Sequence, residues 1–184
     1  MEDKDRETKI VESILSGKTD DFDIIINDYR DRLYSFLYRL CLNEAVAEEI
    51  LQQAFIKAFK YLDKWDSSKG LKNWLYMIAR NAFYDYVTKE NKFKTVCMED
   101  MQFFLASCES GPEDKAILKS EYEDVLKNIY ELKPKYSEIL ILRYVEEKSY
   151  EEIGEILNIP LGTVKIRLHR AKEKLINLVA SESG

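Results

Sequence analysis

Apolar residues recur three and four positions apart along most of the chain, the spacing that lines one face of an α-helix. Alternating Val, Ile and Thr runs bounded by turn residues, which are typical of strands, do not occur, and only 6 Gly and 3 Pro are present among 184 residues. The pattern therefore predicts an all-α protein. The expected helices span about residues 7–15, 21–42, 44–62, 71–91, 113–131, 134–145, 150–157 and 161–179.

The helical periodicity fails between Lys92 and Pro112, and the last six residues of this stretch combine Ser, Cys, Glu, Gly and Pro, as linkers do. A break of this kind predicts two small helical domains joined by a flexible linker. The domains are expected at residues 1–92 and 113–184, with the linker at 93–112.

The second domain carries a helix-turn-helix pattern. Ser149 can cap a helix, and Glu152 can reach back to it, which together form a capping box. Asn158 tolerates the left-handed backbone of a tight turn, and Pro160 stops one helix and can open the next. Gly154 would cost about 1 kcal/mol relative to Ala unless another helix approaches closely there. A short helix, a tight turn and a longer basic helix together predict binding to duplex DNA.

On a helical wheel, the last helix separates an apolar face from a basic one. The face expected in the core is formed by Val164, Leu168, Ala171 and Leu175. The residues expected to contact duplex DNA in the major groove are Thr163, Lys165, Ile166, Arg167, His169 and Arg170. Lys and Arg there would bind phosphates, and Ile166 would contact a thymine methyl group or a sugar. The alternative is an ordinary bundle helix with a solvated basic face.

The helix expected at residues 44–62 has an apolar stripe and a mixed face. The stripe consists of Ala47, Ile50, Leu51, Ala54, Ala58 and Leu62. On the other face, Ile56 and Phe59 lie among amides and charges, a mixture that favours protein docking over a solvated surface. The residues expected to bind a partner protein are Glu49, Gln52, Gln53 and Ile56. Isolated exposed apolar residues without function are the alternative.

The helix expected at residues 71–91 gathers aromatic, amide and cationic side chains opposite its core stripe. The core stripe is centred on Leu75, Ile78, Ala82 and Tyr86. The opposite face is formed by Trp74, Met77, Arg80, Asn81, Tyr84, Asp85 and Thr88, with Lys89 and Lys92 beyond. Such a surface suits single-stranded DNA, because unstacked bases need stacking partners and hydrogen bonds to their edges. The residues expected to contact it are Arg80, Asn81, Tyr84, Asp85 and Lys89.

The net charge of −6 is unevenly distributed. Residues 57–95 carry 9 basic and 4 acidic groups, and residues 159–184 carry 5 and 2, so both expected DNA-binding helices lie in basic segments. The remaining segments, 1–56 and 96–158, are acidic. Because electrostatic attraction decays over about 10 Å in salt, the basic segments can bind phosphates locally while the acidic remainder weakens DNA binding by the free protein.

Other function classes find little support. Cys41, Cys97 and Cys108 are scattered and His169 is the only histidine, so no familiar metal site can be assembled. The sequence shows no nucleophile paired with a general base and no phosphate-binding loop. We therefore expect no catalysis, no cofactor and no small-molecule substrate. No apolar stretch nears the roughly 18–20 residues of a membrane span, and MEDKDRETK has no apolar signal core, so we expect a cytoplasmic protein without membrane insertion.

These pieces, in this order, resemble the extracytoplasmic-function (ECF) subgroup of the sigma-70 family of bacterial RNA polymerase sigma factors. The stretch SYEEIGEILNIPLGTVKIRLHRAKEKL, residues 149–175, resembles region 4 of that family. AEEILQQAFIKAF, residues 47–59, resembles region 2.2, and WLYMIARNAFYDY, residues 74–86, resembles regions 2.3 and 2.4. The likeness covers nearly all of the chain, and it implies a subunit that directs RNA polymerase to promoters and assists promoter melting.

The resemblance also implies roles for single residues. The patch that binds the clamp helices of the largest polymerase subunit is matched by Glu49, Gln52 and Gln53. Positions facing the extruded base of the −10 element are matched by Asn81 and Asp85, and the loop forming its pocket by residues 65–72. Positions that meet the −35 element are matched by Lys165, Ile166, His169 and Arg170. Further implied partners are the flap of the second-largest subunit, promoter DNA and an anti-sigma factor.

The chain departs from the family pattern at three positions. Gln53 stands where an acid is usual, and Leu161 and Ile166 stand where polar residues are common, so a −35 sequence cannot be transferred from relatives. Two other functions are alternatives. A stand-alone helix-turn-helix regulator that binds operator DNA would leave residues 44–92 without a role, and an adaptor would bind polymerase without touching DNA.

Overall fold

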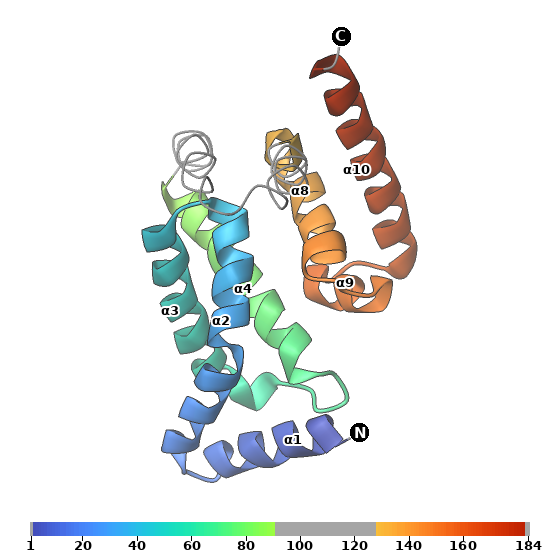
Figure 1. Ribbon diagram of the computed structural model, residues 1–184. Helices are drawn as coiled ribbons and strands as arrows, with labels where there is room; N and C mark the ends of the chain where they lie inside the picture. The colour runs from blue at the N-terminus through green and yellow to red at the C-terminus, as the bar shows by residue number, and fades with distance from the viewer. Residues whose placement is uncertain (1, 91–127, 183–184) are drawn as a thin grey trace, which may run out of the picture. The chain divides into compact units, whose positions relative to one another are not determined.

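The computed structural model describes residues 2–90 and 128–182, and the regular structure in these two stretches is helical (Figure 1). The chain divides into two compact units, Met1–Phe93 and Lys94–Gly184. The all-α prediction is confirmed. The expected linker at 93–112 and most of the helix expected at 113–131 lie outside the described residues. Within the two described stretches, no helix is both long enough and apolar enough to cross a bilayer.

The first unit is built from α-helices linked by two short 3-10 turns. Its elements are α1 (Glu2–Leu15), η1 (Thr19–Asp21), α2 (Phe22–Cys41), α3 (Glu44–Lys60), η2 (Leu62–Lys64) and α4 (Leu71–Glu90). The first helix starts at Glu2 rather than near Glu7. Its polar first turns are held by distant partners, since Arg6 Nη1 lies 2.8 Å from Asp28 Oδ2 and Lys4 Nζ donates to the Ser68 carbonyl at 3.2 Å. A local apolar pattern does not reveal such contacts.

The break between α2 and α3 follows from two adjacent residues. Leu42 ends α2 in the left-handed conformation, with a φ of 54°. Asn43 then caps α3, because its Oδ1 accepts a hydrogen bond from the Val46 amide at 2.9 Å. The predicted break at Asn43 is confirmed. At its other end α3 stops at Lys60, two residues before the predicted end, and the tighter η2 turn carries Leu62 into the core.

The core of the first unit lies between α2, α3 and α4, which pack side by side, while α1 crosses near one end of them (Figure 1). Half of the buried residues of α3 are small, with Ala47, Ala54 and Ala58 buried as predicted. Tyr76 and Phe83 of α4 are also buried, which the helical wheel did not predict, while Tyr86 is only half-buried. Because α4 contacts both α2 and α3, its buried surface is wider than a single stripe.

The second unit contains the helix-turn-helix. Residues 128–131 are helical and are followed by α8 (Pro134–Leu140), the π-helical turn η4 (Ile141–Val145), α9 (Tyr150–Leu157) and α10 (Leu161–Glu182). The helix predicted at 134–145 therefore ends in a wider turn, in which the Glu146 amide donates to the Ile141 carbonyl at 2.9 Å. The bounds predicted for α9 are confirmed, and α10 extends three residues past the predicted Val179.

Side chains from α8, η4, α9 and α10 share one core. Its fully buried members include Ile139, Leu140, Leu142, Ile153, Ile156, Val164 and Leu168. The segment before α9 is tied back to η4, because the Arg143 guanidinium donates to the Lys148 carbonyl at 2.7 Å. This packing fixes the direction in which α10 leaves the turn.

Candidate nucleic-acid interface

The turn between α9 and α10 has the geometry expected from the sequence. Ser149 Oγ accepts from the Glu152 amide at 3.1 Å, and Glu152 Oε2 accepts from the Ser149 amide at 2.8 Å, so the capping box is confirmed. Asn158 ends α9 in the left-handed region, with a φ of 52°. A Cβ atom on Gly154 would lie 3.1 Å from the Ile159 carbonyl oxygen, tighter than ordinary contacts, which explains the glycine at this close approach.

The outer face of α10 is exposed along its N-terminal half. Val164, Leu168 and Ala171 are buried, as predicted, while Leu175 is half-buried. The exposed residues among those expected at duplex DNA are Thr163, Lys165, Ile166, His169 and Arg170. Arg167 is half-buried at the edge of the core stripe. Ile166 is 56% exposed, so its side chain is available for an apolar contact with a partner.

A cluster of rings and cations next to α10 was not predicted. The Arg143 guanidinium lies 5.2 Å from the Tyr150 ring centroid, and Lys172 Nζ lies 5.3 Å from that of Tyr144. Hydrogen bonding to Tyr144 raises the pKa of Lys172, so this ammonium stays charged. The four residues come from three elements, η4, α9 and α10, and no single helical wheel brings them together. Cations held in this way can bind phosphates.

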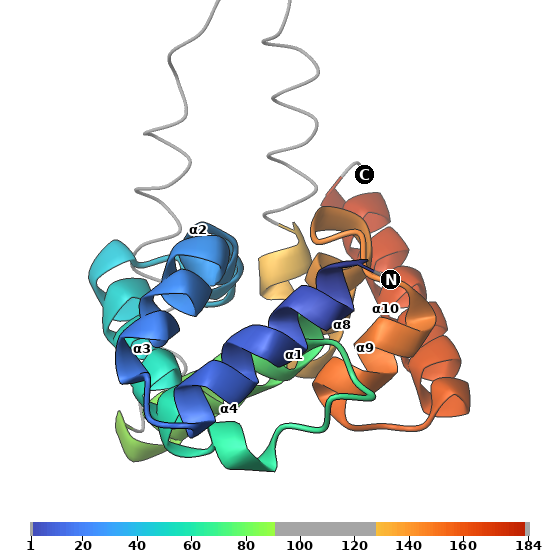
Figure 2. The same ribbon diagram turned by 90° about the horizontal axis from the view of Figure 1, so that it is seen from below.

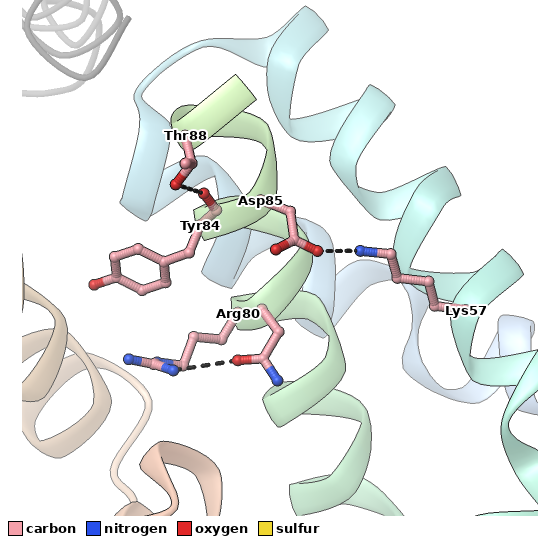
Figure 3. A network of polar contacts seen from close by, with 6 residues as sticks. Lys57, Arg80, Tyr84, Asp85 and Thr88 are labelled. Carbon is pink, nitrogen blue, oxygen red and sulfur yellow. Dashed lines mark hydrogen bonds and ion pairs between the residues drawn. The ribbon is translucent and has the colours of Figure 1, made fainter. Parts of the chain in front are cut away.

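The outer face of α4 presents an arginine and a tyrosine together. The Arg80 guanidinium lies 4.6 Å from the Tyr84 ring centroid, and its Nη1 donates to Asn81 Oδ1 at 3.2 Å. Figure 3 shows Arg80 and Tyr84 on one side of the helix, whereas Asp85 turns toward Lys57 of α3. Lys57 Nζ lies 2.6 Å from Asp85 Oδ2. Lys57 was not predicted to take part, because a pair 28 residues apart on two helices leaves no local signal.

The remaining residues expected on this face differ in exposure. Lys89 is exposed, and Trp74 and Met77 are half-buried. The side chain of Asn81 is exposed, so its amide can reach a base edge. Arg80, Asn81 and Tyr84 are linked by contacts on the outer side of α4, while Lys89 is exposed further along the helix. A ring, a cation and an amide held together in this way suit single-stranded DNA.

The loop between η2 and α4 lies at the start of this face. Asp66 Oδ1 accepts from the Ser68 amide at 2.9 Å, and the Lys69 amide donates to the Asp66 carbonyl at 2.9 Å, which closes a tight turn. Hydrogen bonds from Ser68 lower the pKa of the Asp66 carboxyl. Trp65 is half-buried, and its indole Nε1 is buried without a hydrogen-bond acceptor. Lys72, the last residue expected in the loop, lies in the first turn of α4.

The outer face of α3 exposes a mixed surface. Ile56 is 68% exposed, and Gln53 Nε2 donates to Glu49 Oε1 at 3.2 Å. Gln52 is exposed, so the residues expected to bind a partner protein share one accessible face. Phe59 is partly covered, because its ring packs edge-on against Phe22 of α2, with 5.1 Å between centroids.

Comparison with known proteins identifies the family. Residues 25–93 match the family model of sigma-70 region 2, and residues 122–175 match that of sigma-70 region 4. The ECF RNA polymerase sigma factor SigW of Bacillus subtilis is 34% identical over 174 residues, which cover 91% of this chain and 93% of SigW. The chain belongs to the ECF group of the sigma-70 family. SigM of the same organism is 33% identical over 153 residues, which cover 83% of this sigma factor and 91% of SigM.

Solved structures support the fold. CnrH, in complex with the cytosolic domain of CnrY, aligns with a TM-score of 0.66 at 18% identity, over 94% of this sigma factor and 96% of CnrH. RpoE from Bartonella quintana, in complex with the anti-sigma factor NepR, aligns with a TM-score of 0.63 at 24% identity, over 87% of this sigma factor and 97% of RpoE. Because both sigma regions match in order, the alternative of a stand-alone helix-turn-helix regulator is not favoured.

Proposed function

We propose that this ECF sigma factor binds core RNA polymerase through the outer face of α3 and directs it to promoters with −35 and −10 elements. The α10 face then binds the duplex −35 element, and the α4 face holds the opened −10 strand. The protein is not an enzyme in this proposal, acts in the cytoplasm and requires no cofactor. The observation that carries the proposal is the presence, in one chain, of an exposed helix-turn-helix face and a separate face with a ring, cations and an amide.

The −35 contact follows from the exposed side chains of α10. A helix fits the major groove, where Lys165 and Arg170 would bind phosphates or guanine edges. Ile166 would contact a thymine methyl group. The cations of Arg143 and Lys172 would add phosphate contacts that position the domain without carrying sequence information.

The −10 contact follows from the side chains on the outer face of α4, where Asn81 is exposed and Arg80 and Tyr84 are half-buried. An extruded base can stack on Tyr84, whose ring already carries the Arg80 guanidinium, and Asn81 can hydrogen-bond to its edge. Unstacking one base costs a few kcal/mol, and capturing it offsets that cost, so melting needs no ATP. Asp85 is paired with Lys57 through Oδ2 in the free protein, so its other oxygen, Oδ1, would accept a hydrogen bond from a base edge while the pair stays in place.

The proposed protein partners are two subunits of RNA polymerase and an anti-sigma factor. The clamp helices of the largest polymerase subunit would contact Glu49, Gln52, Gln53 and Ile56, and the flap of the second-largest subunit would contact the second unit. The solved structures of CnrH and RpoE are complexes with another protein, and for RpoE that protein is the anti-sigma factor NepR. An anti-sigma factor is therefore the proposed regulator of this chain.

Run-off transcription with core RNA polymerase and the full chain tests the proposal. The wild-type protein should start transcription at one position on a cognate promoter selected from a random library. Asn81→Ala should reduce open-complex formation and Arg170→Ala should reduce closed-complex binding, each about tenfold, as loss of one specific contact predicts. Lys18→Ala, an exposed lysine outside both faces, is the matched control.

Two outcomes would contradict the proposal. One is the absence of affinity between the purified chain and core polymerase. The other is tight, sequence-specific duplex binding by the chain alone with no effect on transcription, which is the behaviour of a stand-alone regulator.

A further inference from the structure

Helix α1 lies outside the segment that matches sigma-70 region 2, which begins at residue 25. Figures 1 and 2 both place its N-terminal half beside the loop that precedes α4. The apolar side of α1 is anchored in the unit, since Val11 and Ile14 are buried. Its polar first turns are therefore held at a defined position next to residues 65–70.

Glu7 connects α1 to two other helices. Its Oε2 accepts a hydrogen bond from the amide of Leu71, the first residue of α4, at 3.1 Å. Its Oε1 accepts from the Tyr29 hydroxyl of α2 at 2.5 Å. Burial and the Glu7 carboxylate raise the pKa of Tyr29, so the hydroxyl remains a donor. Both oxygens of one carboxylate are thus used to join three helices.

The first turn of α4 needs a cap from outside. The first amides of a helix have no partner within the helix, and a side chain just before it usually accepts from one of them. Gly70 precedes α4 and has no side chain to do so. Glu7 supplies the acceptor from 64 residues away, and a carboxylate at this end also suits the helix dipole.

Two further contacts fix the same region. Lys4 Nζ donates to the carbonyl of Ser68, inside the loop, at 3.2 Å. Arg6 Nη1 lies 2.8 Å from Asp28 Oδ2, which holds α1 in register with α2. The loop and the start of α4 are consequently tied to α1 at two points, Ser68 and Leu71.

We propose that Glu7 is a positioning residue for −10 recognition, and that α1 acts as a brace that sets the place of the 65–70 loop and the first turn of α4. This inference rests on the proposed function, in which the loop and α4 receive the −10 base. Recognition of a base requires its pocket to be held within about 0.5 Å, so releasing the brace should lower discrimination between −10 bases. The −35 contacts, made by the other unit, should not change.

The test compares promoters that carry each of the four bases at every −10 position, transcribed by holoenzyme containing the full chain. Glu7→Ala should reduce the preference for the cognate −10 base about tenfold, the effect expected for a lost charge-assisted hydrogen bond. Tyr29→Phe removes one hydroxyl and should give a smaller loss of the same kind. Glu7→Gln keeps an acceptor for the Leu71 amide and should retain most of the preference. Glu12→Ala, on the same helix and exposed, is the control.

The outcomes separate this inference from the proposed function. If holoenzyme containing the wild-type chain shows no promoter-dependent transcription, the proposed function is overturned. If the wild-type protein selects its promoter and Glu7→Ala keeps the same −10 preference, the brace is overturned and the proposed function stands. Equal losses of −10 and −35 preference in Glu7→Ala would also overturn the brace. Circular dichroism establishes that each variant is folded, and Tyr29→Phe, which removes a single oxygen, carries the test if Glu7→Ala does not fold.

Discussion

The capping box of α9 can be tested quantitatively, because its two hydrogen bonds are reciprocal and local. Ser149→Ala removes the acceptor of the Glu152 amide. Loss of an N-cap side chain costs about 1 kcal/mol, which is about fivefold in the equilibrium between folded and unfolded α9. Ile153 and Ile156 are fully buried, and each contributes about 2 kcal/mol by burial, so the helix should remain folded. We therefore expect a measurable loss of stability without loss of structure.

Urea unfolding followed by circular dichroism measures the total effect, and hydrogen exchange of the α9 amides locates it. Exchange is needed because two units can unfold separately, so that a single transition does not report on one helix. Glu152→Gln keeps an acceptor for the Ser149 amide but removes a negative charge at the helix N-terminus, which should cost about 0.5 kcal/mol. The double variant should lose less unfolding free energy than the two single variants together, because each hydrogen bond of the capping box supports the other.

Ser67→Ala serves as the control, since Ser67 is an exposed serine in the first unit. It should leave exchange in α9 unchanged. Unaltered α9 exchange in Ser149→Ala, or an equal loss in the control, would show that the capping box does not stabilise this helix.

Two other predictions concern single exposed residues. Ile166→Ser should change stability by less than about 0.5 kcal/mol but weaken promoter binding by the holoenzyme about fivefold; a large drop in the melting temperature would instead assign Ile166 to the core. Hydrogen bonds from Ser68 lower the pKa of the Asp66 carboxyl. The ionised carboxylate therefore stabilises the turn fully at pH values above its ordinary pKa of about 3.9, and this stabilisation is lost as the pH falls through the lower pKa of the folded protein. An NMR titration of the Ser68 amide with a midpoint at or above 3.9 would contradict this.

Local signals predicted the helix-turn-helix of the second unit well. The start of α9 at Tyr150 and its end at Leu157 depend on Ser149 and Asn158, which act on their immediate neighbours. The exposed face of α10 followed from its periodicity, because one side of this helix packs against the unit. Such features are readable in sequence, since each is decided within one or two turns of chain.

Contacts between distant segments were not predictable in this way. The start of α1 depends on Asp28 and Ser68, and the pairing of Asp85 depends on Lys57 of another helix. The helical wheel also assumes one buried face, which fails for Tyr76, because α4 is covered by both α2 and α3. The contact between Glu7 and Leu71 belongs to the same class, and only the folded structure brings the two together.

The small inner residues of α3 have a consequence for how this protein can change. Ala47, Ala54 and Ala58 leave no space between α3 and its neighbours, so a larger side chain there would push whole helices apart. Glu49, Gln52 and Ile56 point to solvent and can be replaced with little strain. One helix thus tolerates few changes on its inward side, while its outward side can be refitted to a different partner.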